Sequence, residues 1–325
     1  MDPVIVGLQD RIEEYLKKLD IPVQPLSLYE PVRYMLSLGG KRMRPVLVLL
    51  ANKMFNGKAE VAFPAAAGIE VFHNFTLLHD DIMDNAPLRR GKPTVHEKWN
   101  ANIAILSGDA MFVKSCQLMM QSPISAMPAV MNLFLKTALE VCEGQQMDMD
   151  FEKEENVSIE NYLEMIRLKT AVLLGAGLGI GAAIAGAAPS EVNHLYDFGV
   201  NLGVAFQLQD DILDVYGDAA KFGKQVGGDI LSNKKTFLLL TAINLATADV
   251  QSDLNYWLDY SGSDTHEKVK SMTAIYDKLN VRDVAETKMD QLYMDALAHL
   301  DALPLTIDQT RSLRDLAAML MERES

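Results

Sequence analysis

The sequence predicts an all-α fold, a single helical domain that spans residues 1–325. Helix-forming residues are frequent, and apolar residues recur at spacings of three and four along most of the chain. Runs that alternate apolar and polar residues, which are typical of strands, are scarce. We therefore expect roughly ten or more helices joined by short loops, with breaks in the segment 85–93 and at several Pro and Gly positions. These positions are Pro22, Pro25, Gly39, Gly40, Pro123, Pro128, Pro189, Gly227 and Gly228.

Two segments could be either ordinary helices or signals for targeting or membrane insertion. The amino-terminal MDPVIVGLQDRIEEYLKKLD mixes acidic and basic residues with apolar ones, which predicts a surface helix and not a signal peptide. Residues 171–188, AVLLGAGLGIGAAIAGAA, are apolar throughout and nearly long enough to span a bilayer. Half or more of them are Gly and Ala, which let helices approach closely. We therefore expect a buried central helix here and no membrane span.

Charge and cysteine content narrow the class of protein. The 325 residues carry a formal net charge of −14, which argues against a general nucleic-acid binder. Only two cysteines occur, Cys116 and Cys142, and neither belongs to a CxxC pair. A disulfide scaffold or a structural zinc site is therefore not expected, and a reducing cytoplasm fits this composition best.

Two acidic motifs with the same spacing follow apolar helical stretches that lie far apart in the chain. The first is DDIMD at residues 80–84, and the second is DDILD at residues 210–214. On a helix Asp80 and Asp84 share one face, whereas Asp81 is rotated from them by about 100°. Either motif alone could be a solvated helix end, but two copies with identical spacing predict a shared chemical role.

Clustered carboxylates repel one another and call for a compensating cation. Oxygen ligands without a nearby His or Cys cluster favour a hard ion, Mg²⁺ over Zn²⁺. Mg²⁺ usually keeps waters and takes its other ligands from substrate phosphates. If the fold brings the two motifs together, the sequence therefore predicts a diphosphate held between them.

Two basic motifs have the features of an anion site. In GGKRMRP, residues 39–45, two glycines expose backbone N–H groups beside Lys and Arg, and a helix is expected to start at Pro45. The segment NAPLRRGKP, residues 85–93, directly follows the first acidic motif, and its arginines are rigid bidentate donors to phosphate. GGKRMRP alone could be a basic turn, but beside paired acidic motifs it favours a diphosphate ligand.

These motifs, in this order, resemble those of the trans-isoprenyl diphosphate synthases, the family of farnesyl and geranylgeranyl diphosphate synthases. The resemblance rests on GGKRMRP, LLHDDIMD, LRRGKPT, EGQQMDMD, RLKT, FQLQDDILD and GKQVGGDILSNKKT, which run from about residue 39 to residue 236. It implies a large helical bundle around a central cavity, the isoprenoid synthase fold, usually assembled as a homodimer. It also implies that isopentenyl diphosphate is joined to an allylic diphosphate with the help of about three Mg²⁺ ions.

The resemblance implies roles for the acidic residues at matching positions. Asp80 and Asp84 resemble ligands of two Mg²⁺ ions, and Asp210 resembles the ligand of a third. Asp148, in EGQQMDMD, resembles a further carboxylate near the first pair. The carboxylates expected to support the ions through water or hydrogen bonds are Asp81, Asp211 and Asp214.

The resemblance also divides the basic and polar residues between two substrates. Those expected at the allylic diphosphate are Arg89, Lys169, Lys224 and Lys234. Those expected at the isopentenyl diphosphate are Gly40, Lys41, Arg44, His73 and Arg90. Thr170 and Gln207 resemble neighbours of the reacting carbons, where oxygen dipoles stabilise cationic character. Gln145 is a further substrate-binding candidate, although it and Gln207 could equally bond neighbouring helices, and Lys235 is interpreted as a solvated neighbour of Lys234.

The resemblance also implies that the residues just before the first aspartate often set product length. One helical turn is about 5 Å, close to one isoprene unit, so a bulky residue one turn below the aspartates stops the growing chain. Phe75 lies five residues before Asp80, Phe72 lies eight before it, and Thr76 is small. This pattern favours a C20 product, geranylgeranyl diphosphate, over the C15 farnesyl diphosphate. Both phenylalanines could equally be ordinary core aromatics.

Two alternatives come from other functional classes. A class I terpene cyclase also uses an aspartate-rich helix and Mg²⁺, but it would not need GGKRMRP for a second diphosphate. A non-catalytic modulatory subunit would be expected to lack one aspartate motif or its lysines, and this chain has both. The sequence therefore favours the synthase.

Overall fold

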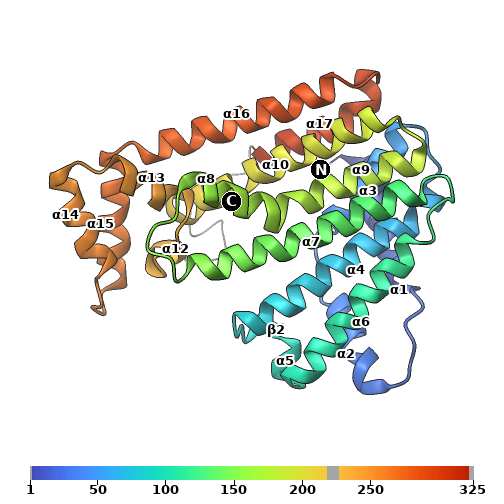
Figure 1. Ribbon diagram of the computed structural model, residues 1–325, viewed down its shortest axis with the longest axis horizontal. Helices are drawn as coiled ribbons and strands as arrows, with labels where there is room; N and C mark the ends of the chain where they lie inside the picture. Colours follow the sequence, from blue (N-terminus) through green and yellow to red (C-terminus); the bar gives the residue numbers. More distant parts are fainter. Residues whose placement is uncertain (1, 218–226, 322–325) are drawn as a thin grey trace. The chain divides into compact units, whose positions relative to one another are not determined.

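The computed structural model describes residues 2–217 and 227–321. Almost all of the regular structure in these ranges is helical, which confirms the predicted all-α class (Figure 1). The exception is a two-stranded antiparallel ribbon, β1 (Leu88–Arg89) and β2 (Lys92–Pro93), in a segment expected to break the helical pattern. The predicted Pro and Gly breaks fall between helices or in the first turn of a helix.

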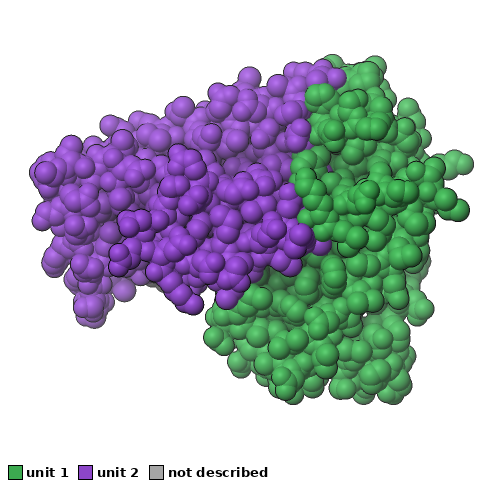
Figure 2. Space-filling view, viewed as in Figure 1, with its two compact units in different colours: residues 1–136, 176–196, 303–313 green, residues 137–175, 197–302, 314–325 purple. Residues whose placement is uncertain are grey.

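The chain divides into two compact units, which have different colours in Figure 2. Unit 1 consists of Met1–Lys136, Ala176–Tyr196 and Leu303–Leu313, and unit 2 of Thr137–Gly175, Asp197–Ala302 and Arg314–Ser325. The single domain expected for residues 1–325 stays a prediction. The division falls within four helices, α7 (Met127–Phe151), α9 (Val172–Ala185), α10 (Pro189–Tyr216) and α17 (Ile307–Met321).

In unit 1, α4 (Ala59–Met83) is the helix around which the others pack. It lies beside α6 (Ala101–Met119), as Figure 1 shows, and against α3 (Met43–Met54). Apolar and small residues cover most of α4, so it is buried on most sides instead of along one stripe. The last turn of α4 carries the first acidic motif, and this packing therefore sets its place. The other helices that contact α4 are α1 (Pro3–Lys17), α2 (Leu26–Ser37) and α5 (Val95–Lys98).

The GGKRMRP segment forms a sharp turn into α3. This helix begins at Met43, two residues before the start expected at Pro45. Arg42 precedes it in the left-handed conformation, and Gly39 and Gly40 also have positive φ values, 77° and 140°. Glycine adopts such values without the steric penalty of a Cβ atom, which explains the pair of glycines at this turn.

In unit 2, a short π-helical turn, η1 (Arg167–Ala171), follows α8 (Ile159–Ile166). Two glycines let neighbouring helices approach this turn closely. A Cβ atom on Gly144 of α7 would lie 2.2 Å from the Lys169 backbone nitrogen, and one on Gly203 of α10 would lie 2.7 Å from the Ala171 Cβ. The remaining helices of unit 2 are α12 (Gly228–Leu231), α13 (Phe237–Leu245), α14 (Ala248–Leu258), α15 (Thr265–Lys278) and α16 (Val281–Asp301).

Within residues 2–217 and 227–321, two helical stretches have the length and apolar composition of a membrane span, Ala59–Met83 and Ile159–Ala185. Of their most apolar windows, 67% and 72% of the residues are buried inside the protein. Such burial is typical of core helices. The second stretch contains α9, and its burial agrees with the core helix expected for residues 171–188.

Candidate active site

The first acidic motif ends α4 and presents its aspartates in two directions. Asp80 is half-buried and Asp84, which caps the helix, is exposed. Residues three, four and seven apart share a helix face, so His73, Asp80 and Asp84 lie along one side of α4. Asp81 lies on another side, and its side chain is only 2% exposed. As expected, Asp81 therefore faces a different side of the helix from Asp80 and Asp84.

Asp81 holds an arginine of the basic segment that follows. The Arg89 Nε donates to both carboxylate oxygens of Asp81 at 2.9 and 2.8 Å, and its Nη2 lies 2.7 Å from Oδ1. Arg89 belongs to the β1–β2 ribbon, whose turn residues Arg90 and Gly91 both have positive φ, as a type I′ turn requires. Asp81 thus orients the arginine that was expected at the allylic diphosphate.

Arg90 brings the ribbon to the GGKRMRP turn. A Cβ atom on Gly40 would lie 3.0 to 3.1 Å from three atoms of the Arg90 guanidinium, which therefore rests directly on the glycine backbone. Any side chain at Gly40 would push Arg90 away. The two basic motifs, about 50 residues apart, therefore meet in unit 1.

Arg44 and His73, both half-buried, form the inner part of this cationic cluster. The Arg44 Nη1 lies 3.2 Å from His73 Nε2, and because arginine only donates, the ring nitrogen accepts. Burial, followed by the charges of Arg44, Arg90, Arg89 and Arg42, holds the pKa of His73 well below its usual range. The imidazole is therefore neutral at physiological pH. The Arg44 Nε is buried and has no hydrogen-bond partner among the described residues, a donor that an anion would satisfy.

The expected chain-length residues lie on α4 before Asp80. Phe72 is fully buried, and its ring centroid lies 5.6 Å from Phe75 and 5.3 Å from Phe134. Phe75 is only half-buried and contacts the ring of Phe112 at 5.5 Å. The Thr76 hydroxyl donates to the His73 carbonyl at 2.8 Å. The ring of Phe72 thus packs in the core against Phe75, and an influence on product length stays a prediction for Phe72, Phe75 and Thr76.

The second acidic motif ends α10 in unit 2 and divides in the same way. Asp210 and Asp214 are half-buried, as is Gln207, and all three share one side of the helix. Asp211 is buried, and its Oδ2 accepts from the Tyr162 hydroxyl at 2.5 Å. Burial raises the pKa of Asp211 to about 7, although this hydrogen bond lowers it. Asp211 thus ties α8 to α10, and its expected supporting role at a metal stays a prediction.

Lys169 and Asp148 form an ion pair beside the π-helical turn. The Lys169 Nζ lies 2.5 Å from Asp148 Oδ2, and both side chains are just over one-quarter exposed. Thr170 follows in the same turn and is half-buried. The π-helical turn widens the helix locally, a feature frequent at functional sites. The Lys169–Asp148 ion pair therefore joins two motifs of the predicted site, RLKT and EGQQMDMD.

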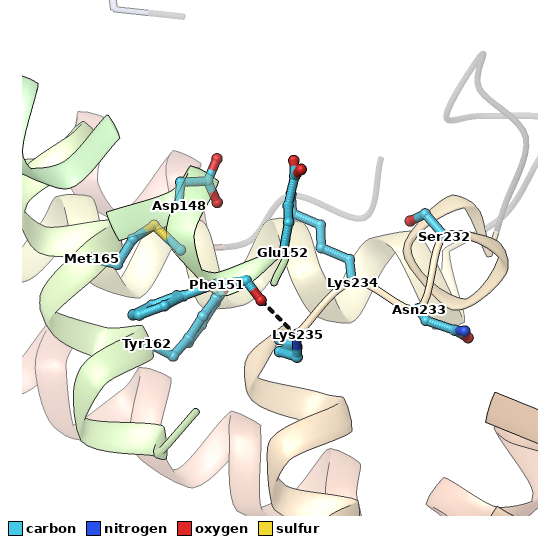
Figure 3. Close-up of a pocket in the computed structure, with 9 residues that line it drawn as sticks. All are labelled: Asp148, Phe151, Glu152, Tyr162, Met165, Ser232, Asn233, Lys234 and Lys235. Carbon is cyan, nitrogen blue, oxygen red and sulfur yellow. Dashed lines mark hydrogen bonds between the residues drawn. The ribbon is translucent and has the colours of Figure 1, made fainter. Parts of the chain in front are cut away.

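A pocket of about 380 Å³ in unit 2 contains Asp148 and Lys234 in its lining (Figure 3). Lys234 lies 3.9 Å from Asp229 Oδ1. Burial alone would lower the pKa of Lys234, but four carboxylates, with Asp229 foremost, outweigh it and raise the pKa. The Lys234 amine therefore stays charged, as is required of a side chain that binds a diphosphate. The Lys235 Nζ donates to the Phe151 carbonyl at 2.5 Å, so the interpretation of Lys235 as a solvated neighbour was wrong.

The structure gives less information on three further residues that were expected at the site. Lys41 is exposed and its carbonyl accepts from the Gln9 side chain at 2.7 Å, which anchors the turn. Gln145 is half-buried on α7. Lys224 lies outside the described residues.

The acidic residues fit Mg²⁺ by their chemistry. Within residues 2–217 and 227–321, no three His, Cys, Asp or Glu side chains converge into a metal cage of their own. The candidate ligands are carboxylates in small sets, such as Asp80 with Asp84 and Asp210 with Asp214. Mg²⁺ is commonly bound by one or two carboxylates together with substrate phosphates, so these sets suit an ion that arrives with a diphosphate.

Comparisons with known proteins agree on one family. The family model described as polyprenyl synthetase matches residues 25–276. The geranylgeranyl diphosphate synthase of Sulfolobus acidocaldarius is 36% identical over 325 aligned residues, which cover 98% of this chain and 96% of the relative. A crystal structure of a geranylgeranyl pyrophosphate synthase is 42% identical, covers 100% of both chains and superposes with a TM-score of 0.93. The Corynebacterium glutamicum geranylgeranyl pyrophosphate synthase, complexed with isoprenyl diphosphate and magnesium, is 29% identical with a TM-score of 0.83 and 99% coverage of each chain.

Proposed function

The chain belongs to the polyprenyl synthetase family and is a prenyltransferase, and we propose that it elongates allylic diphosphates with isopentenyl diphosphate to geranylgeranyl diphosphate. The observation that carries this proposal is the cationic cluster in unit 1. There Arg44, whose Nε has no partner in the described part of the chain, lies beside neutral His73. A second diphosphate site is what separates a synthase from a terpene cyclase. The C20 product is supported by the names of two similar proteins, both of them geranylgeranyl diphosphate synthases.

Isopentenyl diphosphate binds, in this proposal, to the GGKRMRP turn and its neighbours. Arg44 and Arg90 donate to the diphosphate, and Lys41 adds charge from the exposed side. Gly40 allows Arg90 to lie close to the turn. Neutral His73 can act as a hydrogen-bond partner without adding a further buried charge.

The allylic diphosphate is bound by Arg89, Lys169 and Lys234. Asp81 fixes the guanidinium plane of Arg89, so little side-chain entropy is lost when the substrate arrives. Lys169 is paired with Asp148. When the diphosphate binds, its oxygens would replace the Asp148 carboxylate as the partner of Lys169. The carboxylates proposed to hold Mg²⁺ with this diphosphate are Asp80, Asp84, Asp148 and Asp210, and those proposed to support the ions are Asp211 and Asp214.

The reaction begins when the allylic C–O bond breaks and its electron pair leaves with the diphosphate. Bound Mg²⁺, about three ions, supplies positive charge to that leaving group. Arg89, Lys169 and Lys234 stabilise the same charge more strongly in the transition state than in the intact substrate. The double bond of isopentenyl diphosphate then attacks the allylic cation, and the departed diphosphate takes the released proton. Thr170 and Gln207 would direct oxygen dipoles toward the cation.

Removal of divalent metal tests the reaction directly. We expect EDTA to abolish incorporation of labelled isopentenyl diphosphate with C5, C10 and C15 primers, and excess Mg²⁺ to restore it, because the leaving charge is otherwise uncompensated. Chromatography of the products should then give a C20 chain from each primer. Undiminished turnover with EDTA, cyclised hydrocarbons, or no elongation by the metal-loaded protein would each contradict the proposal.

Phe75→Ala is expected to lengthen the product. Loss of the half-buried ring opens space one helical turn below Asp80, and one turn corresponds to about one isoprene unit. Chain-length analysis should show C25 alongside C20. Phe63→Leu is the matched control, because Phe63 is buried at the other end of α4 and its truncation should lower stability without a change in length. An unchanged product distribution for Phe75→Ala would refute the assignment.

We further propose a cytoplasmic homodimer. Three large apolar side chains, spaced seven residues apart along one face of α6 and its C-cap residue, are more than half exposed in the single chain. They are Leu106, Val113 and Met120. An apolar helix face of this kind is typical of an interface between subunits. Cys116 and Cys142 are both unpaired, which suits a reducing compartment.

A further inference from the structure

The segment that carries Lys234 is short, and local backbone hydrogen bonds hold it together. α12 is only four residues long, and the loop after it passes through Asn233 in the left-handed conformation, with φ of 51°. Within the segment, the Lys234 backbone nitrogen donates to the Asp229 carbonyl at 2.9 Å. So short a helix is marginal by itself, because most helical stability comes from tertiary packing. A cation placed on it therefore depends on neighbouring elements for its position.

Helix α15 supplies one such restraint through a buried lysine. Lys268 is 5% exposed, and its Nζ donates to the Asn233 Oδ1 at 2.8 Å. The Asn233 Nδ2 in turn donates to the Leu258 carbonyl at the end of α14, also at 2.8 Å. Both polar groups of the asparagine side chain are thus held by other helices. The left-handed residue directly before Lys234 is therefore fixed in place.

Burying Lys268 costs free energy, which argues that this side chain does more than fill space in the core. Burial lowers the pKa of Lys268, and the acceptor that its ammonium finds in the described ranges is a neutral amide. A methionine of similar size would fill this space without the desolvation cost of a charged group. The neighbouring Lys270 is exposed, so α15 buries one of two nearby lysines. The buried one is the one that reaches the Lys234 loop.

The next residue of α15 supports the other end of the same segment. Gly227 precedes α12 with φ of +86°, and a Cβ atom there would lie 2.7 Å from both methyl carbons of Val269. Val269 therefore packs directly against the Gly227 backbone. Consecutive residues of α15 thus contact both ends of residues 227–233.

We propose that Lys268 is a positioning residue, which acts through Asn233 to hold Lys234 at the allylic diphosphate. The inference rests on the proposed role of Lys234 and deepens it. It assigns to α15 a task in substrate binding, although no residue of α15 contacts the substrate in this scheme. Loss of the Lys268 ammonium would release the Asn233 amide oxygen from α15 and let the Lys234 backbone move.

Lys268→Met tests this with Lys270→Met as the matched control on the same helix. We expect KM for the allylic substrate to rise about tenfold or more in Lys268→Met, as for other supporting hydrogen bonds around a site. KM for isopentenyl diphosphate should not change, and Lys270→Met should match the unmodified protein. A general loss of structure would raise both KM values or lower kcat alone, and either pattern would overturn the inference.

Two further measurements separate this inference from the proposed function. Hydrogen exchange of the amides of residues 228–236 should accelerate in Lys268→Met and not in Lys270→Met, whether or not the protein transfers prenyl groups. Asn233→Gly keeps the positive φ but removes the bridge, so adding Lys268→Met to it should cost nothing more. If Lys234→Ala leaves the allylic KM unchanged, the role of Lys234 fails. If Lys234→Ala raises it while Lys268→Met changes neither exchange nor KM, the positioning role fails.

Discussion

Asp80→Asn and Asp210→Asn are each expected to lower kcat/KM on the order of 10³-fold or more, because each removes a charge that would bind cations with the leaving diphosphate. Asparagine keeps the size of aspartate and leaves the fold intact. Asp290→Asn, which neutralises an exposed carboxylate on α16, is the matched control and should retain full activity. Steady-state kinetics at saturating Mg²⁺ measures all three variants.

The double variant tests whether both motifs serve one diphosphate. If Asp80 and Asp210 act on the same leaving group, the combined loss should be far smaller than the product of the two single losses, as for residues that work as a unit. Losses that multiply would indicate two independent sites. Near-normal activity of either single variant would remove that aspartate from the mechanism.

The class of fold follows from sequence because helical periodicity is a local property. Apolar residues at three- and four-residue spacing and the Pro and Gly breaks need no knowledge of tertiary contacts. The π-helical turn at Arg167–Ala171 had no such signal, since RLKTA is an ordinary helical sequence. The ribbon at Leu88–Pro93 was also missed, although Arg90-Gly91 is a plausible turn pair. Two-residue strands are too short to show alternation.

The functional motifs could be found from sequence, but the partners of their residues could not. Asp81 stood out as rotated from Asp80 by helix geometry, yet Arg89 as its partner depends on the turn between them. Tyr162 and Asp211 are 49 residues apart, and Lys268 and Asn233 are 35 apart. Such pairs form only when helices pack. Spacing therefore predicts which residues share a face, and tertiary structure decides which of them face substrate and which support a neighbour.

Arg42 illustrates the same limit within a single motif. It lies between Lys41 and Arg44 in GGKRMRP and was indistinguishable from them as a phosphate donor. Its side chain is 4% exposed, and its Nη1 donates to Glu70 Oε1 at 2.6 Å. Its other donors bond Glu13 Oε2 at 2.9 Å and the Leu36 carbonyl at 2.8 Å. Arg42 thus anchors the turn and leaves the diphosphate to its neighbours.

Breaking this anchor should have the largest effect on stability. Arg42→Met leaves the buried Glu70 without its cation, and we expect a loss of about 3–5 kcal/mol in the free energy of unfolding. Burial opposes the charge of Arg42, but Glu70 and Glu13 outweigh it and raise the pKa of the guanidinium, so Arg42 stays charged. Urea unfolding at one fixed protein concentration measures the change, since subunit association would otherwise contribute.

A second variant distinguishes the two possible causes of this loss of stability, an unpaired buried charge and lost packing. Arg42→Met combined with Glu70→Leu removes both charges, and it should recover a large part of the stability because no unpaired charge remains buried. The Lys18–Glu14 pair, which is as short at 2.5 Å but about 70% exposed, provides the control, and Lys18→Met should change stability little. If the double variant is no more stable than Arg42→Met, lost packing and the hydrogen bond to the Leu36 carbonyl would explain the effect in place of charge. The double variant should also bind isopentenyl diphosphate poorly, because its refilled core still lacks the arginine that holds the turn of Lys41 and Arg44.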